Sequence, residues 1–364
     1  MEINKKDIKD ILVWCPNWIG DVIMCIPAIM ALRTRYPNAG ITAVVGIPGN
    51  EILKGNSIID EVIPYQRRGE RYKSLTEGIR LIRYLRKRDL DMAVIFPNSF
   101  RSALMVLMTG ARYRIGYLTE GRGLFLTTGI KVTEYKKDRH MVEYFLDIVR
   151  AIGCKTPKKR PSFRLHPKER GFALDYLHNR GVNDSDLLIG IHPGASKPPR
   201  AWSSKRFGML CDRLYRDLCA RIIIFGGSND KGMVSDIVSG IESNTKQRLI
   251  TAVGETDLMQ TAALIERCHI FVGNDSGIMH IAGMVKTPIV AIFGPGRPEE
   301  TGPFCAKEKV EIISKDYPCS PCRHRFFKEC KPSIDNKSPC IEDIEVADVM
   351  RGVERLIERG VVRH

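Results

Sequence analysis

The sequence predicts an α/β protein with two domains, each built on a parallel sheet flanked by helices. Apolar strand-like runs alternate with helix-like segments along nearly the whole chain. This alternation stops at residues 156–167, a stretch rich in Pro and Lys without clear periodicity, and then restarts. The 364 residues are enough for two domains of ordinary size, each with its own core. Repeated βα alternation favours parallel sheets, and a restart after a linker favours two of them.

Each expected element is an apolar run or an amphipathic segment of matching length. The expected strands are 11–15, 41–45, 61–64, 92–96, 187–192, 221–225, 270–272 and 289–293. The expected helices are 22–35, 73–88, 100–108, 140–152, 168–180, 205–218, 231–241, 258–267, 278–285 and 342–359. We therefore expect domains at 1–167 and 168–341, followed by a terminal segment, 342–364, that contains an amphipathic helix.

Charge is distributed unevenly along the chain. Residues 1–180 hold 32 Lys and Arg against 18 Asp and Glu, whereas residues 181–364 hold 25 against 24. Such a basic half predicts an anionic partner, either a phosphorylated substrate or an anionic membrane face, although a solubilising surface is the simpler alternative. Nucleic acid is disfavoured because no binding motif is present and the basic runs lack interleaved aromatic residues.

Three features predict a cytoplasmic protein. Eleven cysteines, several of them in expected core segments, suit a reducing compartment better than a disulfide framework. The first ten residues are charged, which does not fit a signal peptide. No apolar run reaches the length of a membrane span.

The segment 273–280, Gly-Asn-Asp-Ser-Gly-Ile-Met-His, follows an expected strand and opens an expected helix. Free backbone N–H groups and the helix dipole favour a phosphate at such a place. Gly277 permits close approach, Ser276 can cap the helix or donate to an oxygen, and His280 lies one turn further in. An ordinary capped strand-to-helix turn is the alternative interpretation.

A second turn of this type occupies residues 16–21, Pro-Asn-Trp-Ile-Gly-Asp, between the first expected strand and helix. Gly20 permits close backbone approach, and Asp21 lies in the first helical turn. Asp21 is either a carboxylate that interacts with the helix dipole or a general base that faces a ligand cleft.

Further turns follow the carboxyl ends of expected strands. Ligands bind at this edge of a parallel sheet, so these turns are also candidates for the site. Gly194, Ala195 and Ser196 form a small-residue turn followed by Lys197 and Arg200. Backbone donors with nearby cations suit a diphosphate, although either cation could simply be solvated. Residues 254–256, with Gly254 and Thr256, are a weaker candidate for a nucleoside pocket.

A cysteine cluster stands apart from these turns. Cys319, Cys322, Cys330 and Cys340 give the pattern C-x₂-C-x₇-C-x₉-C. Four thiolates with one close pair can form a tetrahedral zinc or iron site. The alternative is four reduced cysteines in a polar loop near 319–340.

The ordered set of motifs resembles the bacterial ADP-heptose:lipopolysaccharide heptosyltransferases of glycosyltransferase family 9, especially their type II enzymes. The motifs are Pro16–Asp21, 96–100 (Phe-Pro-Asn-Ser-Phe), 192–195 (His-Pro-Gly-Ala), 200–202 (Arg-Ala-Trp), 225–228 (Phe-Gly-Gly-Ser), 254–256 (Gly-Glu-Thr) and 274–280 (Asn-Asp-Ser-Gly-Ile-Met-His). The resemblance implies a GT-B fold, in which two Rossmann-like domains face each other across a cleft. The first domain would bind the acceptor and the second the sugar nucleotide. The last helix would be able to cross back to the first domain.

The resemblance also implies roles for single residues. Asp21 would be the catalytic base of a single inverting displacement that releases ADP, with Gly20 close to the transferred sugar. The donor would contact Gly194, Ala195, Ser196, Lys197, Arg200, Gly254, Thr256, Asp275, Ser276, Gly277 and His280. The acceptor would contact Asn98, Ser99 and Arg101. Many family members have Lys where this chain has Arg200, so the diphosphate cation is either Arg200 or Lys197.

The implied partners are ADP-heptose and a lipid A–Kdo–heptose core acceptor at the anionic cytoplasmic face of the inner membrane. Catalysis would need no cofactor, and any zinc or iron would be structural, as in related protein heptosyltransferases. Another acceptor (Kdo, an outer-core sugar or a protein) is the first alternative. A sugar-nucleotide epimerase and a basic nucleotide-binding adaptor are less favoured. A nicotinamide oxidoreductase is disfavoured because neither half has G-x-G-x-x-G after its first strand.

Overall fold

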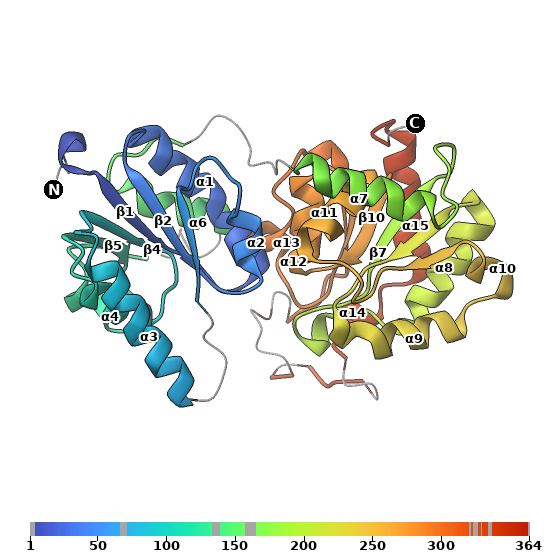
Figure 1. Ribbon diagram of the computed structural model, residues 1–364. Coiled ribbons are helices and arrows are strands. Elements are labelled where there is room, and N and C mark those ends of the chain that lie inside the picture. Colours follow the sequence, from blue (N-terminus) through green and yellow to red (C-terminus); the bar gives the residue numbers. More distant parts are fainter. Residues whose placement is uncertain are drawn as a thin grey trace. The chain divides into compact units, whose positions relative to one another are not determined.

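Each half of the chain forms its own six-stranded sheet in the computed structural model, and all paired strands are parallel (Figure 1). The structure describes residues 4–65, 71–132, 139–156, 165–319, 322, 327–328, 330–333 and 337–362. The chain divides into two compact units, Met1–Pro161 and Ser162–His364, and this division falls inside the linker predicted at 156–167. The predicted α/β class with two parallel sheets is confirmed.

The first unit has the strand order β3-β2-β1-β4-β5-β6. Its strands are β1 (Asp10–Trp14), β2 (Gly40–Val45), β3 (Glu61–Pro64), β4 (Met92–Ile95), β5 (Tyr113–Tyr117) and β6 (Thr128–Ile130). Its helices are α1 (Ile19–Arg35), α2 (Gly49–Leu53), α3 (Arg71–Arg86), α4 (Phe100–Met108) and α6 (Met141–Arg150), with 3₁₀ turns η1 (Lys5–Asp7) and η2 (Arg122–Phe125). α1 packs on α6, whereas α3 and α4 pack together with η2.

The second unit has the order β12-β11-β10-β7-β8-β9. Its strands are β7 (Leu188–His192), β8 (Arg221–Ile224), β9 (Leu249–Thr251), β10 (Ile270–Asn274), β11 (Ile289–Phe293) and β12 (Val310–Ser314). Its helices are α7 (Pro167–His178), α8 (Ser204–Leu218), α9 (Lys231–Gly240), α10 (Ser243–Lys246), α11 (Leu258–Arg267), α12 (Gly277–Met284), α13 (Pro298–Thr301), α14 (Pro339–Glu342) and α15 (Val346–Glu358). Its 3₁₀ turns are η3 (Pro198–Arg200), η4 (Ser228–Asp230) and η5 (Lys307–Lys309).

Each sheet lies at the centre of its own hydrophobic core. The central strands are buried along their whole length, which explains why they are continuous apolar runs rather than alternating ones. In the first unit, Leu12 and Ile95 of the sheet pack against Leu81 of α3 and Val106 of α4. In the second unit, the buried face of α15 belongs to the same cluster as the strands and α8.

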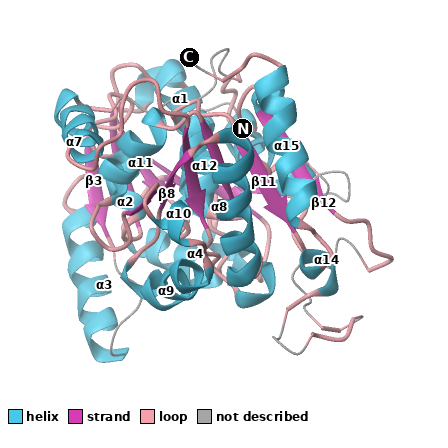
Figure 2. Cartoon of the chain, turned by 90° about the vertical axis from the view of Figure 1, so that its right-hand side faces the viewer, coloured by secondary structure: helices cyan, strands magenta, loops and turns pink. Residues whose placement is uncertain are grey.

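The terminal helix is shorter than expected. The helix predicted at 342–359 begins only at Val346, the first residue of α15, because Glu345 is its N-cap residue and its backbone N–H donates to Asp348 Oδ2 at 2.9 Å. α14 ends at Glu342, where the predicted range begins. α15 packs on β11, β12 and α8 (Figure 2). Gly352 permits this packing, because a Cβ there would lie 3.0 Å from Ile313. The suggested crossing of this helix to the first domain stays a prediction.

All eight expected strands are present, and four further strands were not predicted. These are β5, β6, β9 and β12, of which three lie at a sheet edge. β6 and β9 have only three residues each, and β5 and β12 contain Arg114 and Glu311 within the apolar run. Among the described residues, no helix has both the length and the apolar character needed to cross a bilayer.

Candidate functional site

Each sheet has one switch point, a pair of neighbouring strands from which the chain continues toward opposite edges of the sheet. In the first unit this switch point lies between β1 and β4, where Trp14 pairs with Ile95. In the second unit it lies between β10 and β7, where Gly273 pairs with His192. Ligands of open α/β sheets bind in the crevice outside the carboxyl ends of the strands at such points. Four of the turns singled out from the sequence follow these four strands, whereas residues 254–256 follow β9.

Asp21 follows the first strand at the switch point of the first unit. It is the third residue of α1, is partly buried and lies in the first helical turn. The positive end of the helix dipole favours its ionised form. The turn after β2 packs close by, since a Cβ on Gly49 would lie 3.0 Å from Val22. This position is compatible with both roles considered for Asp21, a dipole carboxylate and a general base.

The turn after β4 holds the predicted acceptor residues. Asn98 Nδ2 donates to Tyr144 Oη at 2.8 Å, and Asn98 O accepts from Thr119 Oγ1 at 3.0 Å. Ser99 caps α4, its Oγ accepting from the Ser102 backbone N–H at 3.3 Å. Through these hydrogen bonds the side chains of Asn98 and Ser99 stabilise the turn. Arg101 lies at the start of α4, where its Nη2 donates to Tyr65 Oη at 3.1 Å.

A fully buried arginine, Arg122, which no sequence motif indicates, supports this turn. Arg122 Nε donates to Tyr117 O at 2.7 Å, and its guanidinium also donates to Pro97 O and to Asn98 Oδ1. Burial lowers the pKa of the Arg122 guanidinium. Gly116 leaves room for it, because a Cβ there would lie 3.2 Å from Arg122 Nη2. Arg122 therefore fixes the carboxyl end of β4 from inside the unit.

Replacing Arg122 by Met is expected to lower the free energy of unfolding by about 2–3 kcal/mol, because buried carbonyl oxygens lose their donor. Urea unfolding measures this change. Arg112→Met is the matched control, since Arg112 is exposed and its loss should cost less than about 0.5 kcal/mol. Equal effects of the two substitutions would show that Arg122 does not support the turn.

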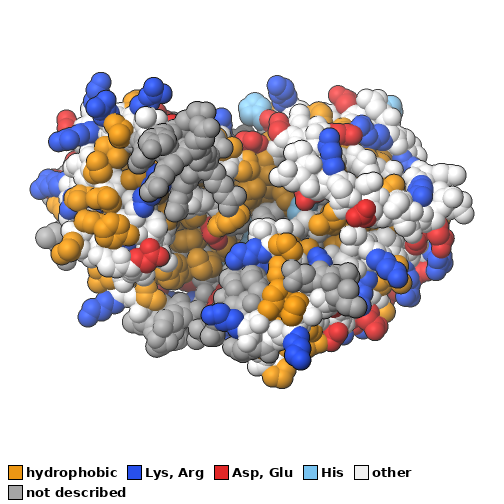
Figure 3. All heavy atoms as spheres, turned by 90° about the horizontal axis from the view of Figure 1, so that it is seen from below, with side chains coloured by type: hydrophobic (Ala, Val, Ile, Leu, Met, Phe, Trp, Pro, Cys, Tyr) orange, Lys and Arg blue, Asp and Glu red, His pale blue; other side chains and the backbone are white. Residues whose placement is uncertain are grey.

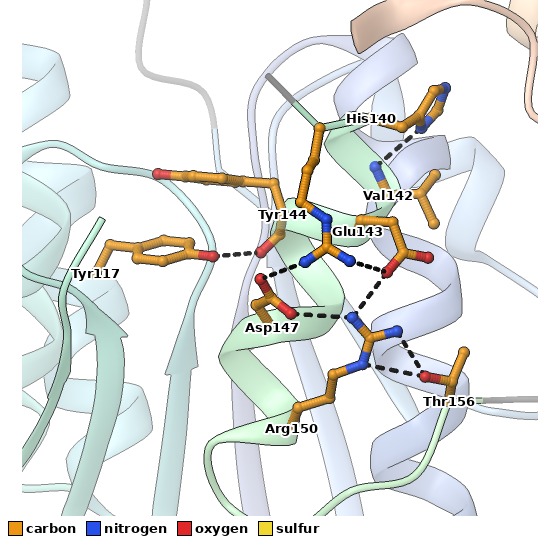
Figure 4. A network of polar contacts seen from close by, with 9 residues as sticks. Tyr117, His140, Val142, Glu143, Tyr144, Asp147, Arg150 and Thr156 are labelled. Atoms are coloured by element: carbon orange, nitrogen blue, oxygen red, sulfur yellow. Dashed lines mark hydrogen bonds and ion pairs between the residues drawn. The ribbon is translucent and has the colours of Figure 1, made fainter. Parts of the chain in front are cut away.

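A charge network on α6 surrounds Tyr144, the hydrogen-bond partner of Asn98 (Figure 4). Arg150 Nη1 contacts Glu143 Oε2 at 2.7 Å and Asp147 Oδ1 at 2.9 Å. Arg139 contacts the same two carboxylates from the amino-terminal side. Tyr117 Oη donates to Tyr144 O at 2.8 Å, and the two rings are stacked 4.2 Å apart. These contacts thereby hold Tyr144, the hydrogen-bond partner of Asn98, in place.

The turn after β10 is the most buried part of the second switch point. Asn274 is fully buried; its Oδ1 accepts from the Trp202 backbone N–H at 3.1 Å and its Nδ2 donates to Pro193 O at 2.7 Å. Trp202 Nε1 donates in turn to Ile344 O at 2.8 Å. Asn274 thus joins the turns after β10 and β7, and Trp202 is an anchor of the fold.

Asp275 forms a buried ion pair with Arg200. Arg200 Nη1 lies 3.2 Å from Asp275 Oδ2, and their side chains are 14% and 6% exposed. Burial raises the pKa of the Asp275 carboxyl, and Arg200 opposes this shift. The carboxylate rests on the turn after β11, since a Cβ on Gly296 would lie 2.6 Å from Asp275 Oδ2. No local sequence pattern indicates this pairing or the contribution of Gly296.

Ser276 is the N-cap residue of α12, but its hydroxyl makes no capping hydrogen bond to the helix. Instead, Ser276 Oγ lies 3.3 Å from His192 Nδ1 at the end of β7. The first backbone N–H groups of α12, beginning at Gly277, are thus not capped by this side chain, and such groups favour an anion. His280 lies within the same helix and is buried.

The pKa of His192 is lowered by burial from 6.5 to about 4, with Asp230 opposing the shift. His192 is therefore neutral near pH 7. Gly194 lies between the two groups, because a Cβ there would be 3.1 Å from Asp230 Oδ1 and 3.1 Å from His192 Cε1. Asp230 Oδ2 also accepts from the Gly227 backbone N–H at 2.8 Å. The turns after β7 and β8 thus meet around His192.

The low pKa of His192 predicts acid sensitivity. Unfolding takes up a proton at His192 between its unfolded pKa of 6.5 and its folded pKa of about 4. This contribution to stability is present above the window and lost as pH falls through it, amounting to about 3 kcal/mol. Urea unfolding at a series of pH values measures the slope. His192→Gln should remove this component; an unchanged slope in that variant would assign the acid sensitivity to other groups.

The other residues predicted to contact the sugar-nucleotide donor lie near this edge and differ in burial and in hydrogen bonding. Ala195 is partly buried, whereas Ser196 and Lys197 are exposed beyond the turn after β7. Gly254 has φ +72° and its N–H donates to Gly226 O at 3.0 Å, next to the turn after β8. Thr256 Oγ1 lies 2.8 Å from Thr261 Oγ1 at the start of α11. The structure thus gathers the turns after β7, β8, β9, β10 and β11 at one edge.

The sequence and the fold of this chain are similar to those of known glycosyltransferases. Residues 79–331 match glycosyltransferase family 9 (heptosyltransferase). The chain belongs to glycosyltransferase family 9. It is 29% identical over 315 residues to lipopolysaccharide heptosyltransferase 2 of Escherichia coli K12, covering 84% of this chain and 89% of that protein. The protein is thus a glycosyltransferase.

Two solved structures extend the comparison. The structure of E. coli ADP-heptose lps heptosyltransferase II has a TM-score of 0.79 at 25% identity, covering 96% of this chain and 99% of that one. The iron-containing dodecameric glycosyltransferase TibC from enterotoxigenic E. coli H10407 has a TM-score of 0.59 at 12% identity, covering 98% and 78%. TibC shares the fold only. The predicted GT-B fold is confirmed by these neighbours.

The four cysteines predicted as metal ligands lie in one neighbourhood of the second unit. Burial and, to a smaller extent, charge repulsion from Cys322, Cys319 and Cys330 together raise the pKa of Cys340 to about 12. Burial and Cys330 also raise the pKa of Cys319. Yet among the described residues, no three His, Cys, Asp or Glu side chains are arranged closely enough to hold a metal ion. As arranged, the thiols do not fit a tetrahedral site.

Proposed function

We propose that the protein transfers L-glycero-D-manno-heptose from ADP-heptose to the inner-core heptose of lipopolysaccharide, with inversion at the anomeric carbon. Membership of the heptosyltransferase family and similarity to lipopolysaccharide heptosyltransferase 2 support this proposal. The observation that carries it is the pair of switch points. Asp21 lies at one, and the Asp275–Arg200 pair lies at the other, together with the half-buried start of α12 that Ser276 does not cap.

In the proposed reaction Asp21 accepts the proton of the acceptor hydroxyl. The hydroxyl oxygen forms a bond to the anomeric carbon from the face opposite the leaving group. The bond from that carbon to the diphosphate oxygen breaks, and its electron pair leaves with ADP. A positioned base of this kind contributes roughly 10²–10⁴-fold to the rate.

On the donor side, we assign the diphosphate to the start of α12 and to the turn formed by Gly194, Ala195 and Ser196. Backbone N–H groups with nearby positive charge stabilise the growing charge on the leaving group. Since Arg200 is engaged by buried Asp275, we assign the cation that meets the diphosphate to exposed Lys197. Gly20 would approach the sugar, His280 would support the helix start, and Gly254 and Thr256 would border the nucleoside.

On the acceptor side, Arg101 would meet the anionic groups of the lipid A–Kdo–heptose acceptor. Asn98 and Ser99 would shape the turn, since their side chains are bonded to Tyr144 and Ser102. The excess of basic residues in 1–180 fits such an anionic acceptor and a position at the cytoplasmic face of the inner membrane.

We also propose that transfer needs no metal, because a carboxylate base and cationic groups supply the required proton acceptor and charge. The cysteines would take up zinc or iron only after Cys319, Cys322, Cys330 and Cys340 draw closer together. Metal analysis of reduced, purified protein tests this; about one equivalent would establish a site, and its removal should leave turnover unchanged.

The function is tested by ADP release from ADP-heptose in the presence of a panel of truncated core acceptors. We expect release that depends on an acceptor ending in a single inner-core heptose. Preference for an acceptor ending in Kdo, for an outer-core acceptor or for a protein would replace the assigned acceptor but keep the chemistry. Conversion of the donor to an isomer without ADP release would instead identify an epimerase.

A further inference from the structure

Exposed apolar side chains are concentrated on one side of the first unit. Eleven large apolar side chains among the described residues are exposed, and six of them lie between residues 79 and 124. They are Ile79, Tyr84, Phe100, Met108, Leu118 and Leu124, which we call the α3–α4 face. Leu124 is 92% exposed. Single exposed apolar residues are normal, but a cluster of this kind marks an interaction surface.

These residues lie on neighbouring elements that cover the same side of the sheet. α3 packs on α4, and α4 packs on η2. Leu81 and Leu85 of α3 point into the core with Val106 of α4, so the opposite sides of both helices face solvent. Phe100 and Phe125 are in edge-to-face contact with ring centroids 4.9 Å apart, which joins α4 to η2. Figure 3 shows hydrophobic side chains gathered over this unit.

The exposed side of α3 is also basic. Arg80, Arg83, Arg86 and Lys87 are exposed there beside Ile79 and Tyr84, against a single exposed acid between residues 76 and 87, Glu77. Further along the face, Arg114 Nε donates to Phe125 O at 2.7 Å, so a guanidinium lies against the apolar turn. Exposed apolar side chains next to cations match the interface of a bilayer that carries anionic headgroups.

The α3–α4 face is joined directly to the turn assigned to the acceptor. Phe100 N–H donates to Glu120 Oε2 at 3.2 Å, and Thr119 Oγ1 donates to Asn98 O at 3.0 Å. Buried Arg122, the first residue of η2, donates to Pro97 O from within. The loop that presents Leu118 and Leu124 is therefore held in place, so it presents its apolar side chains at little further entropic cost.

We infer that the α3–α4 face docks on the surface of a bilayer containing anionic phospholipid and brings the turn 97–101 to the headgroup level. The inference rests on the proposed function in one respect, since only a lipid-anchored acceptor gives this docking a role in turnover. Leu124, Leu118 and Phe100 enter the interface, and the cations of α3 contact the headgroup phosphates.

Sedimentation with vesicles of phosphatidylglycerol and phosphatidylethanolamine tests the surface without donor or acceptor. The double variant Ile79→Glu/Leu124→Glu should reduce the fraction bound at least about tenfold. Leu174→Glu/Met209→Glu is the matched control, because these side chains of the second unit are 50% and 52% exposed and the charge change is the same. The control should bind within about twofold of wild type.

Activity separates docking from chemistry. With a lipid-free core oligosaccharide as acceptor, the face variant should keep KM and kcat within about twofold, whereas its KM for acceptor embedded in vesicles should rise about tenfold. Equal vesicle binding by the face variant and its control would overturn the inference. The inference would also be overturned if the wild-type protein were a dimer and the face variant a monomer, because the α3–α4 face would then bind a second copy of the chain. Absence of ADP release from every acceptor would refute the proposed function while leaving the vesicle result intact.

Discussion

Replacing Asp21 by Asn is expected to reduce turnover by about 10²–10⁴-fold while ADP-heptose binding stays close to wild type. The amide keeps the shape of the carboxylate at the start of α1 but cannot accept the proton of the acceptor hydroxyl. The donor is assigned to the second unit, so its affinity should not depend on this group. Steady-state ADP release gives turnover, and calorimetric titration with a non-transferable donor analogue gives affinity.

A helix-dipole role for Asp21 predicts a different pattern. Glu51, in the first turn of α2 after another strand of the same sheet, supplies the comparison. Glu51→Gln should change turnover less than about twofold, since a dipole carboxylate contributes only about 0.3–1 kcal/mol to stability. Similar, near-normal turnover in both variants would remove Asp21 from the mechanism.

Replacing Asp275 by Ala is expected to lower the free energy of unfolding by about 3–5 kcal/mol, measured by urea unfolding without donor. The substitution leaves the Arg200 guanidinium, whose side chain is 14% exposed, without the carboxylate that now lies 3.2 Å away. A buried charge that loses its counter-charge is far more costly than the loss of a pair in water.

A double variant separates the pair from other effects of the substitution. Asp275→Ala/Arg200→Met should recover more than half of the lost stability, because no buried charge remains. Glu300→Ala is the control, since the Arg297–Glu300 pair is short at 2.7 Å but more exposed, and its loss should cost less than about 1 kcal/mol. A double variant no more stable than Asp275→Ala would contradict a coupled ion pair.

The central part of the fold could be predicted because its strands are unbroken apolar runs. β1, β4, β7 and β10 are buried on both faces, and this burial requires the continuous hydrophobic pattern that identifies them. The short edge strands β6 and β9 carry too few residues to show a pattern. β5 was missed because Arg114 and Gly116 interrupt its run, although Gly116 is there to make room for Arg122.

The site could be predicted as a set of turns but not as a set of contacts. The placement of Asp21 and Asp275 at strand-to-helix turns could be predicted, because small residues follow a strand and open a helix there. The partner of Asp275, Arg200, is 75 residues away in the sequence, and no local pattern indicates their pairing. The side chains of Asn98 and Ser99 bond to Tyr144 and Ser102, and no sequence motif indicates these partners; their contact with acceptor stays a prediction.

The most direct test of the whole account is analysis of the product formed from ADP-heptose labelled with ¹³C in its heptose. After incubation with a core acceptor ending in one heptose, nuclear magnetic resonance reports the configuration at the labelled anomeric carbon. The account predicts an acceptor lengthened by one labelled heptose whose anomeric configuration is opposite to that in the donor. Labelled heptose joined with the donor's configuration, or found only as the free sugar, would contradict it.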